Sequence, residues 1–370
     1  NKENHSRLLR LQEMKILAIE TSCDETAIAL LECTGQLPKP EFKVLGNSLM
    51  SQIHIHKDYG GVYPMLAKRE HIKNLPILFD KTMRESGIKM ADVDYIAVTA
   101  GPGLEPALWT GITFAEDLGK KWGKPVLPIN HMEGHLFSSM FDSNTPIEFP
   151  AIALLVSGGH TELVHVEGFD KFKIIGRTRD DAVGEAFDKV ARLLDLPYPG
   201  GPKISALAEI ARKRKLSDGE SPDVVREPAD KFRFPSPMIN TNDYDFSYSG
   251  LKTSVLYAVK KLGQLSEEMK EDIARAFEDA AIAPVIEKTR RAMNEFGVKS
   301  LILGGGVVAN QHLQSEASKL GEAENLVIHG PRVDLTTDNA LMIGIAAYIR
   351  LLTNRAESNL TIKAQGNLVL

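Results

Sequence analysis

The feature that most constrains the fold is a pattern that occurs twice: two short apolar runs separated by a polar turn. In residues 15–31 the runs are KILAIE and TAIALL, and in residues 151–166 they are AIALLV and TELVHV. Short apolar runs joined by a polar turn are typical of β-hairpins. The recurrence of this hairpin near the middle of the chain predicts a duplicated, two-lobed architecture.

Strand-like and helix-like segments alternate around these hairpins. We expect helices at 65–85, 105–121, 184–195 and 266–296, a closing helix from about residue 337, and strands at 95–99, 126–129, 300–303 and 326–328. This alternation predicts an α/β fold with sheets covered by helices. Pro284 is expected to kink or divide the long helix. Residues 216–245, rich in Pro, Asp and Ser, are expected to form an irregular surface excursion.

The composition excludes a membrane-spanning protein and a secreted disulfide scaffold. No apolar run reaches the roughly 18 residues that a transmembrane helix needs. Only two cysteines, Cys23 and Cys33, occur in 370 residues, which argues for a reducing compartment. We therefore expect a cytoplasmic protein with no membrane partner. Residues 1–13 lack the apolar core of a signal peptide, and we interpret them as an extension before a start at Met14.

The charge balance gives no global attraction to nucleic acid, because the formal net charge is −5. Contacts with RNA therefore require local basic clusters, and such clusters lie at 120–124, 212–215 and 288–291. Each is also typical of a solvated helix face, so the clusters permit RNA binding without establishing it.

The segment HMEGH at residues 131–135 is the sharpest sign of chemistry. Two histidines four apart on a helix share one face, so His131 and His135 can reach one metal ion; a surface or interface pair is the alternative. A zinc protease places its glutamate directly after the first histidine. Glu133 instead lies about 200° around the helix from His131 and faces away from a metal. The spacing favours a metal pair and argues against a protease.

Carboxylates elsewhere in the chain can complete such a site. Asp338, at the start of the last expected helix, is a candidate third ligand, although a helix cap explains it equally well. Asp24 and Glu25, in the first hairpin turn, are able to align metal-bound phosphates. A solvated turn is the alternative interpretation of that pair.

Three glycine-bearing loops indicate a nucleotide site: SGG at 157–159, PGGP at 199–202 and GGG at 304–306. Such loops let backbone N–H groups approach phosphate and leave room for a base or ribose. No Walker sequence or spaced dinucleotide fingerprint is present. Three loops in an α/β chain favour nucleotide binding over a purely structural role.

Taken together, these segments resemble the tRNA N6-adenosine threonylcarbamoyltransferase (TsaD) family. The matching segments are collinear from about residue 15 to about residue 350: IETSCDET (19–26), AKREH (67–71), GPGL (101–104), NHMEGHL (130–136), LVSGGHT (155–161), DAVGEAFDK (181–189), YPGGP (198–202), FSYSGLKT (246–253) and GGGVVAN (304–310). The hairpin turn that contains Cys23 is similar to the bacterial or organellar branch, that is, to a bacterial-type TsaD.

The resemblance implies the two-lobed actin/hexokinase/Hsp70-like (ASKHA) fold with an interlobe nucleotide cleft. The lobes would be residues 14–150, with the helix at about 338–354 packed on them, and residues 151–337. The implied reaction is transfer of a threonylcarbamoyl group from threonylcarbamoyl-adenylate to N6 of adenosine 37 in tRNAs that read codons beginning with A, with release of AMP. It is a metal-dependent acyl transfer.

The resemblance also assigns residues and partners. The implied metal ligands for Fe²⁺ or Zn²⁺ are His131, His135 and Asp338, and Asp24 and Glu25 are candidate catalytic groups. The implied adenylate-binding residues are Leu155, Val156, Ser157, Gly158, Gly159, Asp188, Gly201 and Asn310. The implied partners are tRNA, a TsaB-like paralogue and a TsaE-like ATPase, with the adenylate supplied by a TsaC-like synthase.

One position departs from the family pattern. Many relatives have an acidic residue four positions after the second glycine of the PGGP loop, where it can contact the ribose; here Ser205 occupies it. Three other functions remain as alternatives: an ATP-dependent phosphotransferase or ATPase of the same fold, a metalloprotease, and an inactive scaffold. The first leaves His131 and His135 without a role. Inactive paralogues tend to lack this histidine pair.

Overall fold

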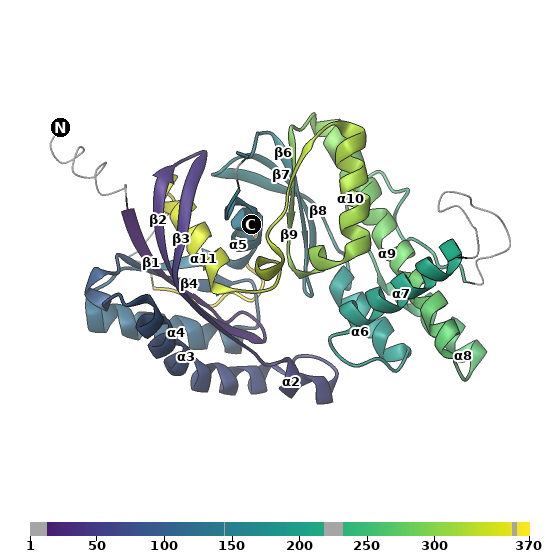
Figure 1. Ribbon diagram of the computed structural model, residues 1–370, viewed down its shortest axis with the longest axis horizontal. Helices are drawn as coiled ribbons and strands as arrows, with labels where there is room; N and C mark the ends of the chain where they lie inside the picture. Colours follow the sequence, from purple (N-terminus) through teal and green to yellow (C-terminus); the bar gives the residue numbers. More distant parts are fainter. Residues whose placement is uncertain (1–12, 144, 218–231, 357–360) are drawn as a thin grey trace.

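The chain forms two five-stranded sheets with the same strand order (Figure 1). The computed structural model describes residues 13–143, 145–217, 232–356 and 361–370. The first sheet, in the order β3-β2-β1-β4-β5, consists of β1 (Glu13–Glu20), β2 (Glu25–Gln36), β3 (Lys39–Ser51), β4 (Tyr95–Gly101) and β5 (Val126–Asn130). The second has the corresponding order β8-β7-β6-β9-β10. It consists of β6 (Ala151–Val156), β7 (Thr161–Gly168), β8 (Lys171–Arg177), β9 (Ser300–Gly304) and β10 (Val327–His329).

The two sheets share their topology as well as their order. In each, the first three strands form an antiparallel meander, the fourth strand runs parallel to the first, and the fifth runs parallel to the fourth. The repeated hairpin pattern corresponds to β1–β2 and β6–β7. This confirms the two-lobed α/β architecture that the pattern predicts.

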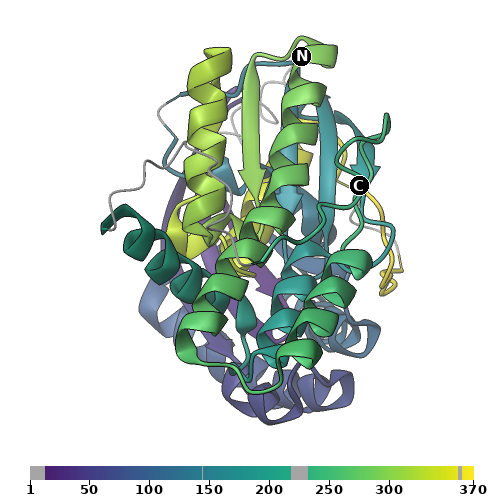
Figure 2. The ribbon, with the colours of Figure 1, turned by 90° about the vertical axis from the view of Figure 1, so that its right-hand side faces the viewer.

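Helices cover the outer face of each sheet. The first sheet is covered by α3 (Pro64–Ser86) and α4 (Glu105–Trp122), and the short α2 (Ile53–His56) follows β3. The second lobe carries α6 (Val183–Leu193), α7 (Gly200–Ser217), α8 (Ser249–Leu262), α9 (Glu267–Phe296) and α10 (Gln311–Glu324). Figure 2 shows α9 and α10 along the outer side of this lobe. Among the described residues, no helix combines the length and apolar character that a bilayer span requires.

Two helices, α5 (His131–Phe137) and α11 (Ala340–Leu352), lie between the sheets and carry the inner core. Side chains alternate along a strand, so Ile16 and Ala18 of β1 face this core, whereas Leu17 and Ile19 face α3 and α4. Every residue of α5 is buried. A Cβ atom on Gly134 would lie 3.0 Å from Met342 Cγ, so glycine at this position lets α5 and α11 cross closely. The inner core therefore fixes the helix of the HMEGH segment against both lobes.

Most expected elements are confirmed to within a few residues of their predicted ends. Pro284 is expected to kink or divide the long helix, and it does not divide it, because α9 runs without a break through the buried Pro284. Four helices (α2, α7, α8, α10) and two strands (β3, β8) are additional to the expected elements. Residues 232–245 of the expected excursion are irregular, but residues 216 and 217 belong to α7 and residue 13 of the expected extension begins β1. Residues 218–231 and 1–12 lie outside the described residues. We propose that the lobes divide between residues 150 and 151, with α11 assigned to the first.

Candidate metal centre and nucleotide loops

Three side chains converge between the lobes as a candidate metal-binding group: His131, His135 and Asp338, whose ligand atoms all lie within 4.8 Å of one another. His131 Nε2 lies 3.4 Å and His135 Nε2 3.2 Å from the same oxygen, Asp338 Oδ1. The histidines stand one turn apart on α5, with ring centroids separated by 4.7 Å. The structure thus brings together the three residues proposed as ligands from the sequence.

The chemistry of His135 fits a metal ligand. Its side chain is wholly buried, and apart from the 3.2 Å ion pair of Nε2 with Asp338 neither ring nitrogen makes a hydrogen bond in the described part of the chain. A buried polar atom without a partner is costly and calls for an explanation. Burial lowers the pKa of His135, so the imidazole is neutral, which is the form that binds a metal. A divalent ion on Nε2 would satisfy this nitrogen.

The charges around His131 favour a positive group at the same place. Burial alone would lower the pKa of His131, but the nearby carboxylates of Asp338 and Glu20 outweigh it and raise that pKa well above its usual range. Burial alone would likewise raise the pKa of Asp338, but His131 and His135 hold it well below the ordinary carboxyl value. A divalent cation on Nε2 would meet the Asp338 carboxylate directly and would leave Nδ1 of His131 to Glu20. Two imidazoles and one carboxylate suit iron or zinc, and the ligand types do not choose between them.

Asp338 is not the cap of α11. That role belongs to Asn339, whose side-chain oxygen accepts a hydrogen bond from Met342 N. Asn130 caps α5 in the same way through Met132 N. The alternative interpretation of Asp338 as a helix cap is therefore wrong, and its carboxylate is left to face the two histidines.

Glu20, at the end of β1, orients His131 and was missed by the sequence reasoning. Its Oε2 lies 3.1 Å from His131 Nδ1 and accepts a hydrogen bond of 2.6 Å from Thr99 Oγ1. Its Oε1 accepts from Ser22 N at 2.5 Å, and Ser22 Oγ lies 3.2 Å from His131 Nδ1. A carboxylate on the far nitrogen of a ligating histidine fixes the ring and raises its basicity. The sequence signal that could have identified Glu20 is a glutamate as the last residue of an otherwise apolar strand.

Substitution of Glu20 by glutamine is expected to weaken metal binding about ten- to hundredfold. Glutamine keeps the shape but removes the charge opposite His131 Nδ1. Competition of Zn²⁺ between the protein and a coloured chelator measures the affinity. Glu32→Gln on the neighbouring strand is the matched control, because Glu32 pairs with Lys43 at the surface. Equal affinities for the native chain and Glu20→Gln would contradict this role.

Glu133 faces away from the metal group, as its spacing predicts. It is 2% exposed and accepts from Arg350 of α11, with Nε at 3.0 Å from Oε2 and Nη2 at 2.9 Å from Oε1. Arg355 lies 3.4 Å from the same Oε1. Two guanidinium groups thus hold Glu133 in a structural ion pair, which leaves it unsuited to act as the general base of a protease.

The glycine loops of the second lobe lie against the metal helix. A Cβ atom on Gly304 would come within 2.6 Å of His135 O, and one on Gly305 within 2.3 Å of Val156 O. These glycines let the GGG loop pack between α5 and the loop after β6. His160 ends the latter loop; burial and the charges of His131 and His135 lower its pKa to about 4. The loop at 155–160 therefore lies within electrostatic reach of the metal group.

Three other glycines have no packing reason to be glycine. A Cβ atom on Gly158, Gly159 or Gly201 would meet no atom within 4 Å. Ser157 Oγ accepts from His160 N at 3.1 Å and shapes the first loop. Asp188 of α6 accepts from Gly200 N at 2.7 Å, and burial raises its pKa. The open space beside these glycines is suited to a nucleotide that approaches the backbone closely.

The carboxylates of the first hairpin turn face this site. Asp24 is buried, which contradicts the solvated-turn interpretation for that residue. Burial, together with the charges of Asp24 and Asp338, raises the pKa of Glu25 well above its usual range. Burial also raises the pKa of Tyr198 in the second lobe, and the charges of Asp24 and Asp188 add to that effect. Groups from both lobes therefore share one electrostatic site.

Two of the basic clusters are partly internal. Lys288 is fully buried and donates to Thr241 Oγ1 and the backbone oxygen of Asp245. Arg212 and Arg214 form ion pairs with acidic residues of α9. Lys120, by contrast, keeps 74% of its side chain exposed. Contact with RNA through Lys288 is therefore excluded in this fold.

Fold and site together define a two-lobed ASKHA protein with a candidate metal centre between its sheets. Among solved structures, HypF from T. kodakarensis has the same fold, with a TM-score of 0.56 and 15% sequence identity over 92% of this chain. The chain spans only about half of that protein (48%), so the likeness concerns the fold alone.

The sequence relationships are more specific. The family model for TsaD, tRNA N6-adenosine threonylcarbamoyltransferase, matches residues 43–345. The protein of that name from Thermosipho africanus is 42% identical over 355 residues, which are 96% of this chain and 99% of the relative. The one from Polynucleobacter necessarius is 44% identical over 349 residues, 92% and 93% of the two chains. The chain belongs to the tRNA N6-adenosine threonylcarbamoyltransferase family.

Proposed function

We propose that this chain transfers a threonylcarbamoyl group from threonylcarbamoyl-adenylate to N6 of adenosine 37, in tRNAs that read codons beginning with A, and releases AMP. The observation that carries the proposal is the contact between the candidate metal helix and the glycine loops, in a chain whose relatives bear this name. A metal group and a nucleotide subsite on one surface suit an acyl-adenylate, whose reacting carbonyl is attached to the phosphate.

Each group in the site has a proposed task. His131, His135 and Asp338 would hold a divalent ion, Fe²⁺ or Zn²⁺, which would supply Lewis-acid chemistry at the substrate. The backbone of residues 155–159 holds the phosphate. Asp188, Gly201 and Asn310 hold the adenosine portion. Fixing both reactants in one cleft lowers the entropic part of the barrier.

The proposed transfer is a substitution at the carbamoyl carbon of the adenylate. The N6 amine of the tRNA adenosine forms a bond to the carbamoyl carbon, and the bond from that carbon to the AMP phosphate oxygen breaks. AMP leaves with the electron pair. The proton of the amine passes to a carboxylate of the first hairpin turn, Asp24 or Glu25. Burial raises the pKa of Glu25, so its carboxylate, when ionised, is a stronger base than an exposed one.

A comparison of two reaction mixtures tests the proposal against the phosphotransferase alternative. The purified protein is given threonylcarbamoyl-adenylate with unmodified tRNA, or ATP with a panel of sugars, and both are repeated with the proposed TsaB-like, TsaE-like and TsaC-like partners. We expect the modified nucleoside in the first mixture and no sugar phosphate in the second. Sugar phosphate without modified nucleoside would establish the alternative.

Substitution of Gly201 by alanine is expected to weaken AMP binding at least about tenfold, or about 1.4 kcal/mol. The added methyl group occupies the open space in which the nucleotide is proposed to lie. Stability should not fall, because Gly201 lies in α7 and alanine favours a helix. Calorimetric titration with AMP measures the affinity. Gly168→Ala is the control, because Gly168 lies at the end of β7 that is farthest from the 157–160 loop. Unchanged AMP binding in Gly201→Ala would show that Gly201 is not part of the nucleotide subsite.

A further inference from the structure

A fully buried carboxylate of α9 lies beside the proposed nucleotide residues. Glu278 is 0% exposed, and its Oε1 accepts a hydrogen bond of 2.6 Å from Asn310 Nδ2. The same Nδ2 donates to Ser205 Oγ at 3.3 Å, and Asn310 Oδ1 accepts from Leu313 N at 2.9 Å to cap α10. Both ends of the Asn310 amide are therefore engaged, and Glu278 makes the shortest of these contacts.

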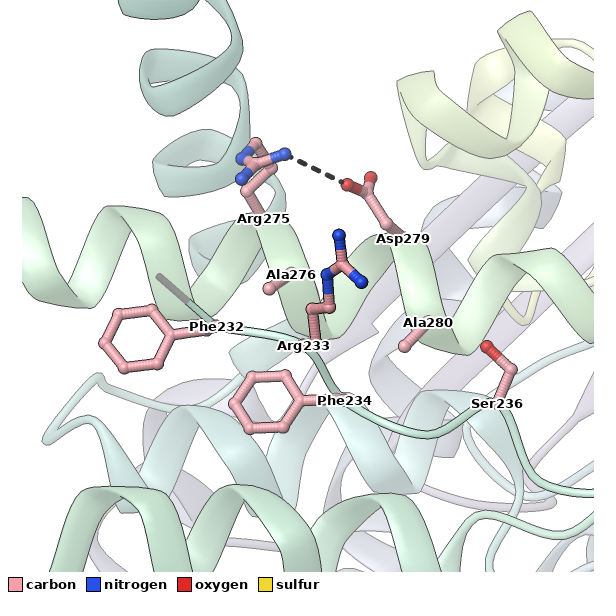
Figure 3. A pocket seen from close by; sticks show the side chains of 8 residues that line it. All are labelled: Phe232, Arg233, Phe234, Ser236, Arg275, Ala276, Asp279 and Ala280. Carbon is pink, nitrogen blue, oxygen red and sulfur yellow. Dashed lines mark ion pairs between the residues drawn. The ribbon is translucent and has the colours of Figure 1, made fainter. Parts of the chain in front are cut away.

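Arg212 of α7 supplies the counter-charge for Glu278. Its Nη1 donates to Glu278 Oε2 and its Nη2 to Asp279 Oδ1, each at 2.5 Å. Burial alone would lower the pKa of Arg212, but the charges of Asp279 and Glu278 outweigh it and raise that pKa. Figure 3 shows Asp279 at an outer pocket of α9, where it also pairs with Arg275 at 3.5 Å. Of the two neighbouring acids, only Glu278 reaches Asn310.

A second ion pair between the same helices provides a comparison. Arg214 donates from Nη1 to Glu271 Oε2 and from Nη2 to Asp272 Oδ1, again at 2.5 Å. This pair joins α7 to α9 through Glu271 and Asp272. Arg214 therefore also holds α7 against α9 without the carboxylate of Glu278. The contact of Glu278 with Asn310 needs a separate explanation.

We propose that Glu278 is a positioning residue of the nucleotide subsite and supplies from α9 the carboxylate that position 205 lacks. Ser205 and Glu278 meet at one nitrogen, Asn310 Nδ2, so a carboxylate on either helix can accept from that amide. A charged acceptor holds an amide more strongly than a neutral one. Glu278 thereby keeps the Asn310 amide in one orientation at the proposed nucleotide subsite. The inference rests on the proposed function in that the ligand is an adenine nucleotide.

An exchange of charge between the two positions tests the proposal. Calorimetry with AMP is expected to show about ten- to hundredfold weaker binding for Glu278→Gln, because a hydrogen bond to a charged group is lost. Adding Ser205→Asp to that variant is expected to restore most of the affinity. Ser205→Asp alone should not improve binding, because two carboxylates then crowd one amide. A purely structural role for Glu278 predicts no such rescue.

Glu271→Gln is the matched control, since it breaks the equivalent ion pair and should leave AMP affinity unchanged. Thermal melts show that each variant is folded. Binding of AMP by Glu278→Gln at the native affinity, or failure of Ser205→Asp to rescue it, would overturn the inference while leaving the proposed function intact. Failure of the native chain itself to bind AMP would overturn both.

Discussion

His135→Ala is expected to bind no metal and to lose the transfer activity. The imidazole is buried, and its one polar contact given by the described residues is the 3.2 Å ion pair of Nε2 with Asp338 Oδ1, so its removal takes a ligand from the metal group and a partner from Asp338. A Lewis-acid ion contributes several kcal/mol to a transition state. Since each 1.36 kcal/mol is tenfold in rate, we expect a fall of at least about a thousandfold. Elemental analysis for metal and chromatography of tRNA nucleosides measure the two losses.

His131→Ala is expected to give the same loss of activity with a larger loss of stability, because Glu20 is then left buried without its imidazole partner. His329→Ala provides the control. His329 is a buried histidine of β10 whose Nε2 also lacks a hydrogen-bond partner in the described ranges, but it lies outside the metal group. Native metal content and native rate in His135→Ala would show that the histidine pair is structural.

Arg350→Ala is expected to destabilise the fold by about 3–5 kcal/mol. Arg350 makes two hydrogen bonds to the buried Glu133 and a third, of 2.9 Å, to the backbone oxygen of Pro128. Without it, Glu133 keeps only the longer contact to Arg355 at 3.4 Å, so a nearly uncompensated charge remains between the sheets. Urea unfolding measures the change in the free energy of unfolding.

Two comparisons make this result specific. Arg332→Ala breaks surface pairs with Asp142 and Asp334 and should cost less than about 1 kcal/mol. Adding Glu133→Gln to Arg350→Ala should recover part of the lost stability, because the unpaired charge is removed. A loss below about 1 kcal/mol in Arg350→Ala would mean that α11 does not hold α5 through this ion pair.

The sequence was sufficient to predict the two-lobed fold because the repeated hairpin and its neighbours carry strong local signals. The helices that it did not predict lack such signals: α8 has two buried residues and α10 has four, and both carry many polar ones. The strand β3 is largely exposed, so its apolar alternation is weak. These elements form because the rest of the lobe packs against them, and that context is not local.

The residues of the site also divide into those with a local sequence signal and those that only the folded structure brings together. The pair His131 and His135 is visible because both residues lie in one helical turn. Glu20 stands 111 positions from His131, and only the pairing of β1 with its neighbours brings them together. Glu278 was hidden among the charged residues of a 30-residue helix, and its burial comes from packing against α7 and α10. Asp338 could be separated from the capping residue only once α11 was seen to begin after Asn339.

The most direct test of the proposed function is the mass of the tRNA after one turnover. The metal-loaded protein, with its proposed partners, is mixed with excess threonylcarbamoyl-adenylate and a limiting amount of unmodified tRNA, and both tRNA and nucleotide are analysed by mass spectrometry. We expect the tRNA to gain one threonylcarbamoyl group on a single adenosine, with tRNA-dependent release of one AMP per modified tRNA. Release of AMP with no change in the mass of the tRNA would contradict the assignment of this chain as the transferase.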